Sequence, residues 1–126
     1  MSTLPFTITL PFGAAFNGAT ELPLASVGSG YGGITVLEAW LHGPSAGTAV
    51  GGILVSMSSV STGGTPAING TVATAAGTIV TAAGVVHKFT ASSTPSLDAG
   101  EFIGYDQASG TIPAGTYISV VAVRGL

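Results

Sequence analysis

The ten residues GITVLEAWLH, at positions 33–42, form the clearest β-strand pattern in the chain. β-Branched and aromatic residues predominate, and successive side chains of a strand point to opposite faces. A regular strand here would place Ile34, Val36, Glu38 and Trp40 on one face, and Thr35, Leu37, Ala39 and Leu41 on the other. The turn residues GPSAG at 43–47 end this strand. We predict its antiparallel partner at residues 49–60, where Gly51 and Gly52 mark a bulge.

Outward from this stretch, short strands and turns alternate along the chain. The 20 glycines and 7 prolines interrupt every window long enough for a helix. Further strands are predicted at 3–10, 20–24, 71–74, 78–80, 85–90, 101–105 and 116–124, and residues 12–16 continue the first strand past a bend. Residues 1–126 are therefore expected to form a single all-β domain. It should be an antiparallel, jelly-roll-like β-sandwich of about eight strands.

The last predicted strand, residues 116–124, has an unusual pattern. Ile118, Val120 and Ala122 form one face, whereas Tyr117, Ser119, Val121 and Val123 form the other. Both faces are apolar in the second half of this strand. Such a strand lies in the middle of a sheet, or it buries its second face against another subunit. We therefore take Val121 and Val123 as candidate interface residues.

Ionised side chains are scarce. Only 6% of the residues are Asp, Glu, Lys or Arg, whereas an ordinary soluble domain has roughly 25%. A surface with so few charges repels copies of itself weakly, so neighbouring proteins are expected to cover much of it. With only two basic residues and a net charge of −3, the chain cannot build a nucleic-acid-binding patch or a site for anionic lipid. The most apolar segment, residues 71–86, is too short for a membrane-spanning helix.

Candidate chemical sites are few. Glu38 shares its predicted face with Trp40, which fits a sugar-binding surface or an acid that bonds to the backbone or to a neighbouring subunit. Asp98, Glu101 and Asp106 form an acidic cluster without the dense spacing of a calcium loop, so they are better explained as turn residues. His42 and His87 lie on separate predicted strands without nearby cysteines. We predict no catalytic residues, no metal site and no cofactor.

Two aromatic residues are candidates for contact with a partner. Tyr31 lies in a glycine-rich loop, where it is either exposed or covers one end of the core. Trp40 lies on the clearest strand, beside Glu38. Together with Val121 and Val123, these residues make up the predicted interface.

Two stretches carry a family resemblance: residues 33–42 with the loop that follows them, and IPAGTYISVVAVRGL at 112–126. With the Ala, Gly, Thr, Ser and Val composition, they resemble small virion proteins of tailed bacteriophages, above all capsid decoration (cement) proteins with a jelly-roll-like sandwich. The resemblance implies a protein on the outside of an icosahedral head, made in the host cytoplasm. It also implies assembly as homo-oligomers, of which trimers fit best, and binding to the major capsid protein or another virion protein. It assigns no functional residues.

Three classes of function follow. The first is capsid decoration. The second is a receptor- or glycan-binding module of a tail or head fibre, for which Tyr31, Trp40 and Glu38 are the candidate residues. The third is an enzyme with a small cupin-like metal site, which would need more histidines near one another than His42 and His87 supply. The sequence favours a structural protein over an enzyme.

Overall fold

The computed structural model describes residues 4–18, 22–27, 32–58, 67–75 and 77–125. Within these ranges the chain forms strands and no helix. The strands are β1 (Phe6–Pro11), β2 (Leu22–Ser26), β3 (Ile34–His42), β4 (Gly47–Val50), β5 (Ile53–Met57), β6 (Ile68–Ala75), β7 (Thr78–Thr81), β8 (Val86–Ala91), β9 (Ser96–Leu97), β10 (Phe102–Asp106), β11 (Ser109–Thr111) and β12 (Tyr117–Arg124).

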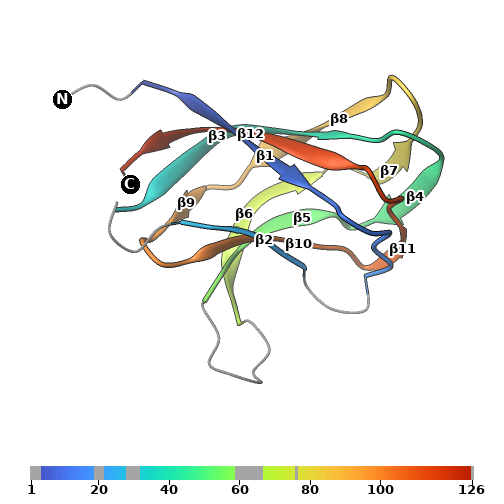
Figure 1. Ribbon diagram of the computed structural model, residues 1–126. Helices are drawn as coiled ribbons and strands as arrows, with labels where there is room; N and C mark the ends of the chain where they lie inside the picture. The colour runs from blue at the N-terminus through green and yellow to red at the C-terminus, as the bar shows by residue number, and fades with distance from the viewer. Residues whose placement is uncertain (1–3, 19–21, 28–31, 59–66, 76, 126) are drawn as a thin grey trace.

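Eight of these strands form a jelly roll. They pair in the order β1-β12-β3-β8-β6-β5-β10-β2, and every pair is antiparallel. Figure 1 shows β1, β12, β3 and β8 in one layer above β6, β5, β10 and β2 in the other. Counted along the chain, the first layer holds the first, eighth, third and sixth of the eight strands. The second layer holds the fifth, fourth, seventh and second. This is the order of two interleaved Greek keys, and it confirms the predicted fold class.

A second, smaller sheet covers one end of the sandwich. Its three strands pair in the order β11-β4-β7, and it lies at the right of Figure 1, away from the start of β1. β4 and β5 were predicted as one strand pairing with β3, and that prediction is wrong. Gly51 has a φ of +70°, so the chain turns a corner between them and enters the other sheet. β3 pairs instead with β12, β8 and β9.

A β-bulge in β3 changes which of its side chains face the core. Glu38 lies opposite Val121 and Val36 lies opposite Ala122, so Leu37 is an extra residue in this strand. Ile34 and Val36 are buried before the bulge, and Ala39 and Leu41 are buried after it. The regular alternation predicted for residues 33–42 is therefore wrong beyond Val36. The bulge shifts the period by one residue, which leaves both Leu37 and Glu38 exposed.

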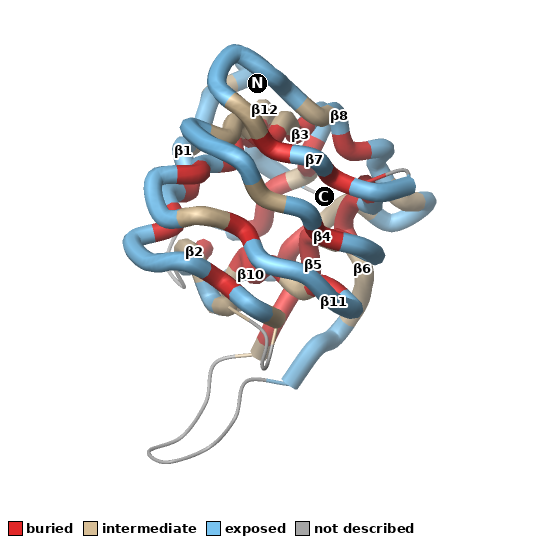
Figure 2. The backbone as a smooth tube through the Cα atoms, turned by 90° about the vertical axis from the view of Figure 1, so that its right-hand side faces the viewer, coloured by how far each residue is buried: buried red, intermediate tan, exposed pale blue. Residues whose placement is uncertain are grey.

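The core lies between the two layers, as the buried segments in Figure 2 show. β1 and β12 follow the predicted alternation, since Leu10, Ile118, Val120 and Ala122 are buried. Phe12 and Phe16 pack edge to face with Tyr105, although residues 12–16 contribute only an isolated bridge from Phe16 to Ile112. The Tyr105 hydroxyl donates a hydrogen bond of 2.9 Å to Gln107 Oε1. Burial, with a smaller effect of the Asp106 charge, raises the pKa of Tyr105 well above its usual value.

Candidate assembly surface

The outer face of the first layer carries a row of aromatic and charged side chains. The register of the strands places Tyr117 opposite His42, Ser119 opposite Trp40, and Val121 opposite Glu38. On the other side of β3, Trp40 lies opposite Lys88 of β8. We name these seven residues the outer patch: Glu38, Trp40, His42, Lys88, Tyr117, Ser119 and Val121. They come from three neighbouring strands, so the sheet backbone fixes their spacing.

One half of the outer patch is an aromatic stack. The rings of His42 and Tyr117 are nearly parallel, at an interplanar angle of 6°, with their centroids 4.4 Å apart. His42 Nε2 lies 3.1 Å from the hydroxyl oxygen of Ser119. These contacts hold the imidazole flat against the phenol ring, and Tyr117 remains 39% exposed. The two stacked rings thus form a flat, largely apolar area on the protein surface.

The other half is built around Trp40. The ammonium group of Lys88 lies 5.1 Å from the centre of the Trp40 ring, within the range of a cation–π contact. The same nitrogen is 3.8 Å from Glu38 Oε1. Both charged side chains are about half exposed, so this ion pair adds little to the stability of the fold. It does neutralise the patch, because its one positive and one negative side chain lie side by side.

The structure describes three of the four predicted interface residues. The structure brings Trp40 and Val121 onto one surface, with Val123 further along the same face of β12, opposite Thr35. Trp40, Val121 and Val123 are all partly exposed. Tyr31 lies outside the described residues. The sequence placed Tyr117 on the same face as Val121. It missed His42 and Lys88 as members of this surface, because only the pairing of strands distant in the sequence brings them to it.

The other candidate groups are held by local hydrogen bonds. Glu101 Oε1 accepts a hydrogen bond of 2.6 Å from the backbone N–H of Asp98, and Glu101 Oε2 accepts one from Asn69. Asp106 accepts one of 2.8 Å from the N–H of Gln107. Within the described ranges, no three His, Asp or Glu residues are grouped as metal ligands. Glu101 and Asp106 thus each accept a hydrogen bond from a backbone N–H close to them in the sequence, as turn-stabilising acids do.

Exposed apolar side chains extend beyond the outer patch. Leu37 and Val86 border the patch and expose 45% and 44% of their surface. Val50 and Val80 lie on the outer face of the small sheet, between threonines 48, 78 and 111. The chain has 6277 Å² of accessible surface for seven ionised side chains, which is about 900 Å² for each. The exposed face of the small sheet is therefore apolar or hydroxylated, and the face around the outer patch adds exposed apolar side chains to one ion pair.

No protein-family model matches the sequence, and no curated protein matches it. Among solved structures, a chain from the structure of infectious bursal disease virus Gx strain is similar, with 13% sequence identity and a TM-score of 0.38. The similarity covers 96% of this chain but 36% of that one, so this chain spans about a third of the viral chain's length. Separately, the described residues contain no helix that is long and apolar enough to cross a membrane.

Proposed function

We propose that this chain is a structural virion protein that decorates and stabilises a bacteriophage head through symmetric protein–protein contacts. A non-catalytic role without a cofactor, and a homo-oligomer on a capsid protein, are parts of the same proposal. The jelly roll supports it only as a fold that viral capsid and lectin domains share. The observation that carries it is the exposed, nearly uncharged surface, with Trp40 and Tyr117 at the centre of one face.

The outer patch has the composition of a protein interface. Trp and Tyr dominate the binding energy of typical interfaces, and their centres are poor in unpaired charge. Each contact would be weak by itself, but symmetry repeats it, and simultaneous contacts on a shell multiply the affinity. Since little of the contact is Coulombic, added salt should change assembly only slightly.

Light scattering of the purified protein tests the oligomeric part of the proposal. We expect a mass several times 12.2 kDa that changes little with salt concentration. Val121→Asp should leave the fold intact, since Val121 is partly exposed, but it places a charge in the middle of the contact. Burying that charge should weaken association by roughly a hundredfold or more. Ser93→Asp, at an exposed turn between β8 and β9, is the matched control.

Two outcomes would contradict this proposal. One is a 12.2 kDa monomer that remains dispersed at high concentration. The other is a Val121→Asp variant that folds and assembles as well as the Ser93→Asp control. Binding to heads that lack the protein, followed by electron microscopy, then distinguishes a capsid position from a fibre position.

A glycan-binding module of a tail or head fibre is the second candidate. It is favoured by the partly exposed Trp40 with Glu38 and Lys88 beside it, since sugars bind to aromatic rings flanked by hydrogen-bonding groups. Against it, the Lys88 ammonium already covers part of the indole. A glycan array with the wild type and Trp40→Ala tests this. Hits that vanish in Trp40→Ala would support it, and an empty array would remove it.

A further inference from the structure

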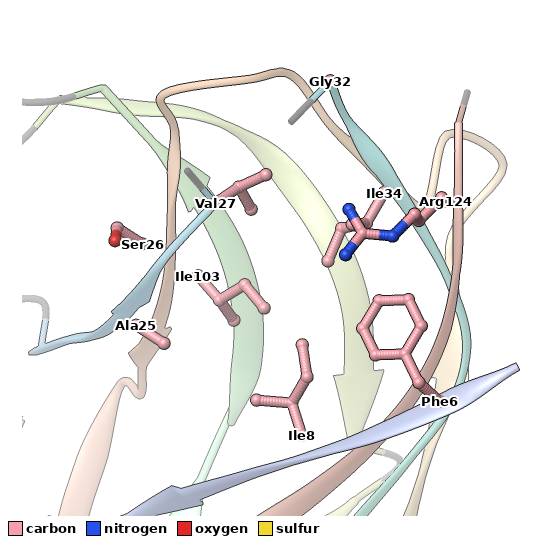
Figure 3. Close-up of a pocket in the computed structure, with 9 residues that line it drawn as sticks. All are labelled: Phe6, Ile8, Ala25, Ser26, Val27, Gly32, Ile34, Ile103 and Arg124. Carbon is pink, nitrogen blue, oxygen red and sulfur yellow. The ribbon is translucent and has the colours of Figure 1, made fainter. Parts of the chain in front are cut away.

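The sandwich has an apolar hollow where its two layers fail to join. β1 and β2 are the two ends of the strand order, and no ladder pairs them. Between them lies a hollow of about 210 Å³, and Figure 3 shows the side chains around it. Of the described residues that line it, Ser26 and Arg124 are polar and the others are apolar side chains or glycine, among them Phe6, Ile8, Ala25 and Ile103.

The hollow is shaped for an apolar side chain. Its volume exceeds that of one leucine side chain, and its walls offer mainly methyl and aromatic carbons. The Arg124 guanidinium lies 5.8 Å from the centre of the Phe6 ring, at one side of the hollow.

The same chain carries an exposed side chain of that kind. Leu4 exposes 77% of its surface, the largest fraction among the exposed large hydrophobic residues of the described segments. It lies two residues before Phe6, the first residue of β1, and is not among the residues that line the hollow. Inserting the Leu4 side chain into an apolar site buries no ionised side chain, since residues 1–5 contain none.

We propose that the N-terminal segment of one copy inserts Leu4 into the hollow between β1 and β2 of a neighbouring copy. Two copies related by a two-fold axis can exchange their segments reciprocally, and a head-to-tail contact whose rotation closes gives a ring. The inference rests on the proposed function, since it adds a second contact between copies of the homo-oligomer. The residues of this contact are different from those of the outer patch.

The absence of cysteine from the sequence makes a clean cross-linking test. Leu4→Cys and Ala25→Cys are made separately, mixed and exposed to mild oxidant. Each chain then has one thiol, so a disulfide between the two variants joins different copies. The control replaces Ala25→Cys by Thr78→Cys, an exposed residue of the small sheet at the far end of the sandwich. We expect disulfide-linked heterodimers with Ala25→Cys, well above the Thr78→Cys background.

A second variant measures the contribution of the side chain. Leu4→Ser should leave the fold unchanged and weaken self-association by roughly ten- to a hundredfold, as expected for the loss of one buried leucine. If wild type is oligomeric but shows neither the specific cross-link nor weakening by Leu4→Ser, this inference is wrong and the proposed function stands. A wild type that is monomeric in light scattering and shows no cross-link overturns both.

Discussion

Deleting Leu37 should leave the fold intact, although it removes a residue from the middle of the longest strand. Without Leu37, β3 reads Ile34, Thr35, Val36, Glu38, Ala39, Trp40 and Leu41. Regular alternation then places the four buried residues on one face and Glu38 and Trp40 on the other, as they already are. The deletion thus removes the bulge but keeps the same residues buried and the same residues exposed.

The expected cost follows from the exposure of each residue. Leu37 is 45% exposed, so its loss forfeits about half of a full leucine burial, or about 1 kcal/mol. Deleting Ala39 instead is the matched control, because Ala39 is 1% exposed. A regular strand would then turn Glu38 into the core, and an unpaired buried carboxylate costs several kcal/mol. Retaining the bulge would force the Trp40 indole into a space that fits a methyl group.

Urea unfolding followed by far-UV circular dichroism measures both variants, and the fluorescence of Trp40, the single tryptophan, reports its surroundings. The Leu37 deletion should unfold cooperatively, with the emission maximum of the wild type. The Ala39 deletion should lose most of a typical stability of about 5–15 kcal/mol. Leu37→Ala separates the loss of the side chain from the loss of the bulge. The reasoning fails if the Leu37 deletion is as unstable as the Ala39 deletion, since the bulge would then be required to curve β3.

Two further predictions concern the core and a corner. The pKa of Tyr105 is raised in the folded state, so its stabilising effect is complete below pH about 10 and is lost as the pH rises above that value. The urea midpoint should therefore fall more steeply in wild type than in Tyr105→Phe between pH 9 and 11, values on the order of the tyrosine pKa. Equal slopes in the two proteins would contradict this. Gly110 has a φ of +94°, and a Cβ there would overlap the carbonyl oxygen of Thr48 and lie 2.9 Å from Ala49 Cα. In thermal unfolding, Gly110→Ala should lower the free energy of unfolding by more than about 2 kcal/mol. The control Gly77→Ala, where φ is also positive but the space is open, should lower it by about 1 kcal/mol. Similar losses in the two variants would show that the overlap at Gly110 relaxes freely.

The sequence predicts the fold class well because its signals are local. In residues 117–124 the buried positions are all apolar and the outward ones begin with Tyr117 and Ser119, so the alternation has one interpretation. In residues 33–42 both Leu37 and Ala39 are apolar, and either phase of the alternation looks acceptable. The bulge depends on the partner strand, so it is invisible in β3 alone. Gly51 similarly predicts an irregularity in the strand. The sequence does not distinguish a bulge within one sheet from a corner at which the chain enters another sheet.

The candidate surface is less predictable than the fold, since its residues meet through long-range pairing. Trp40 and Lys88 are brought together by the β3–β8 ladder, and His42 meets Tyr117 through the β3–β12 ladder. A single sequence contains no signal for either pairing. Trp40 could be named as a candidate because it is a large aromatic residue beside an acid on the clearest strand. Val121 could be named because it makes the second face of its strand apolar. Their companions could not, because a lone histidine or lysine in a strand is an ordinary surface residue.

The scarcity of charge also raises the question of how the sheet edges avoid pairing with other chains. Natural proteins often protect edge strands with lysines, of which this chain has one. At β7, an edge of the small sheet, His87 Nε2 lies 2.6 Å from the carbonyl oxygen of Val80 and 3.2 Å from its nitrogen. In either tautomer Nε2 hydrogen-bonds one of these two backbone groups, and the imidazole lies where an incoming strand would need both. Because β7 is covered in this way while Trp40 and Tyr117 remain exposed on the sheet, we expect association through faces rather than strand addition at that edge.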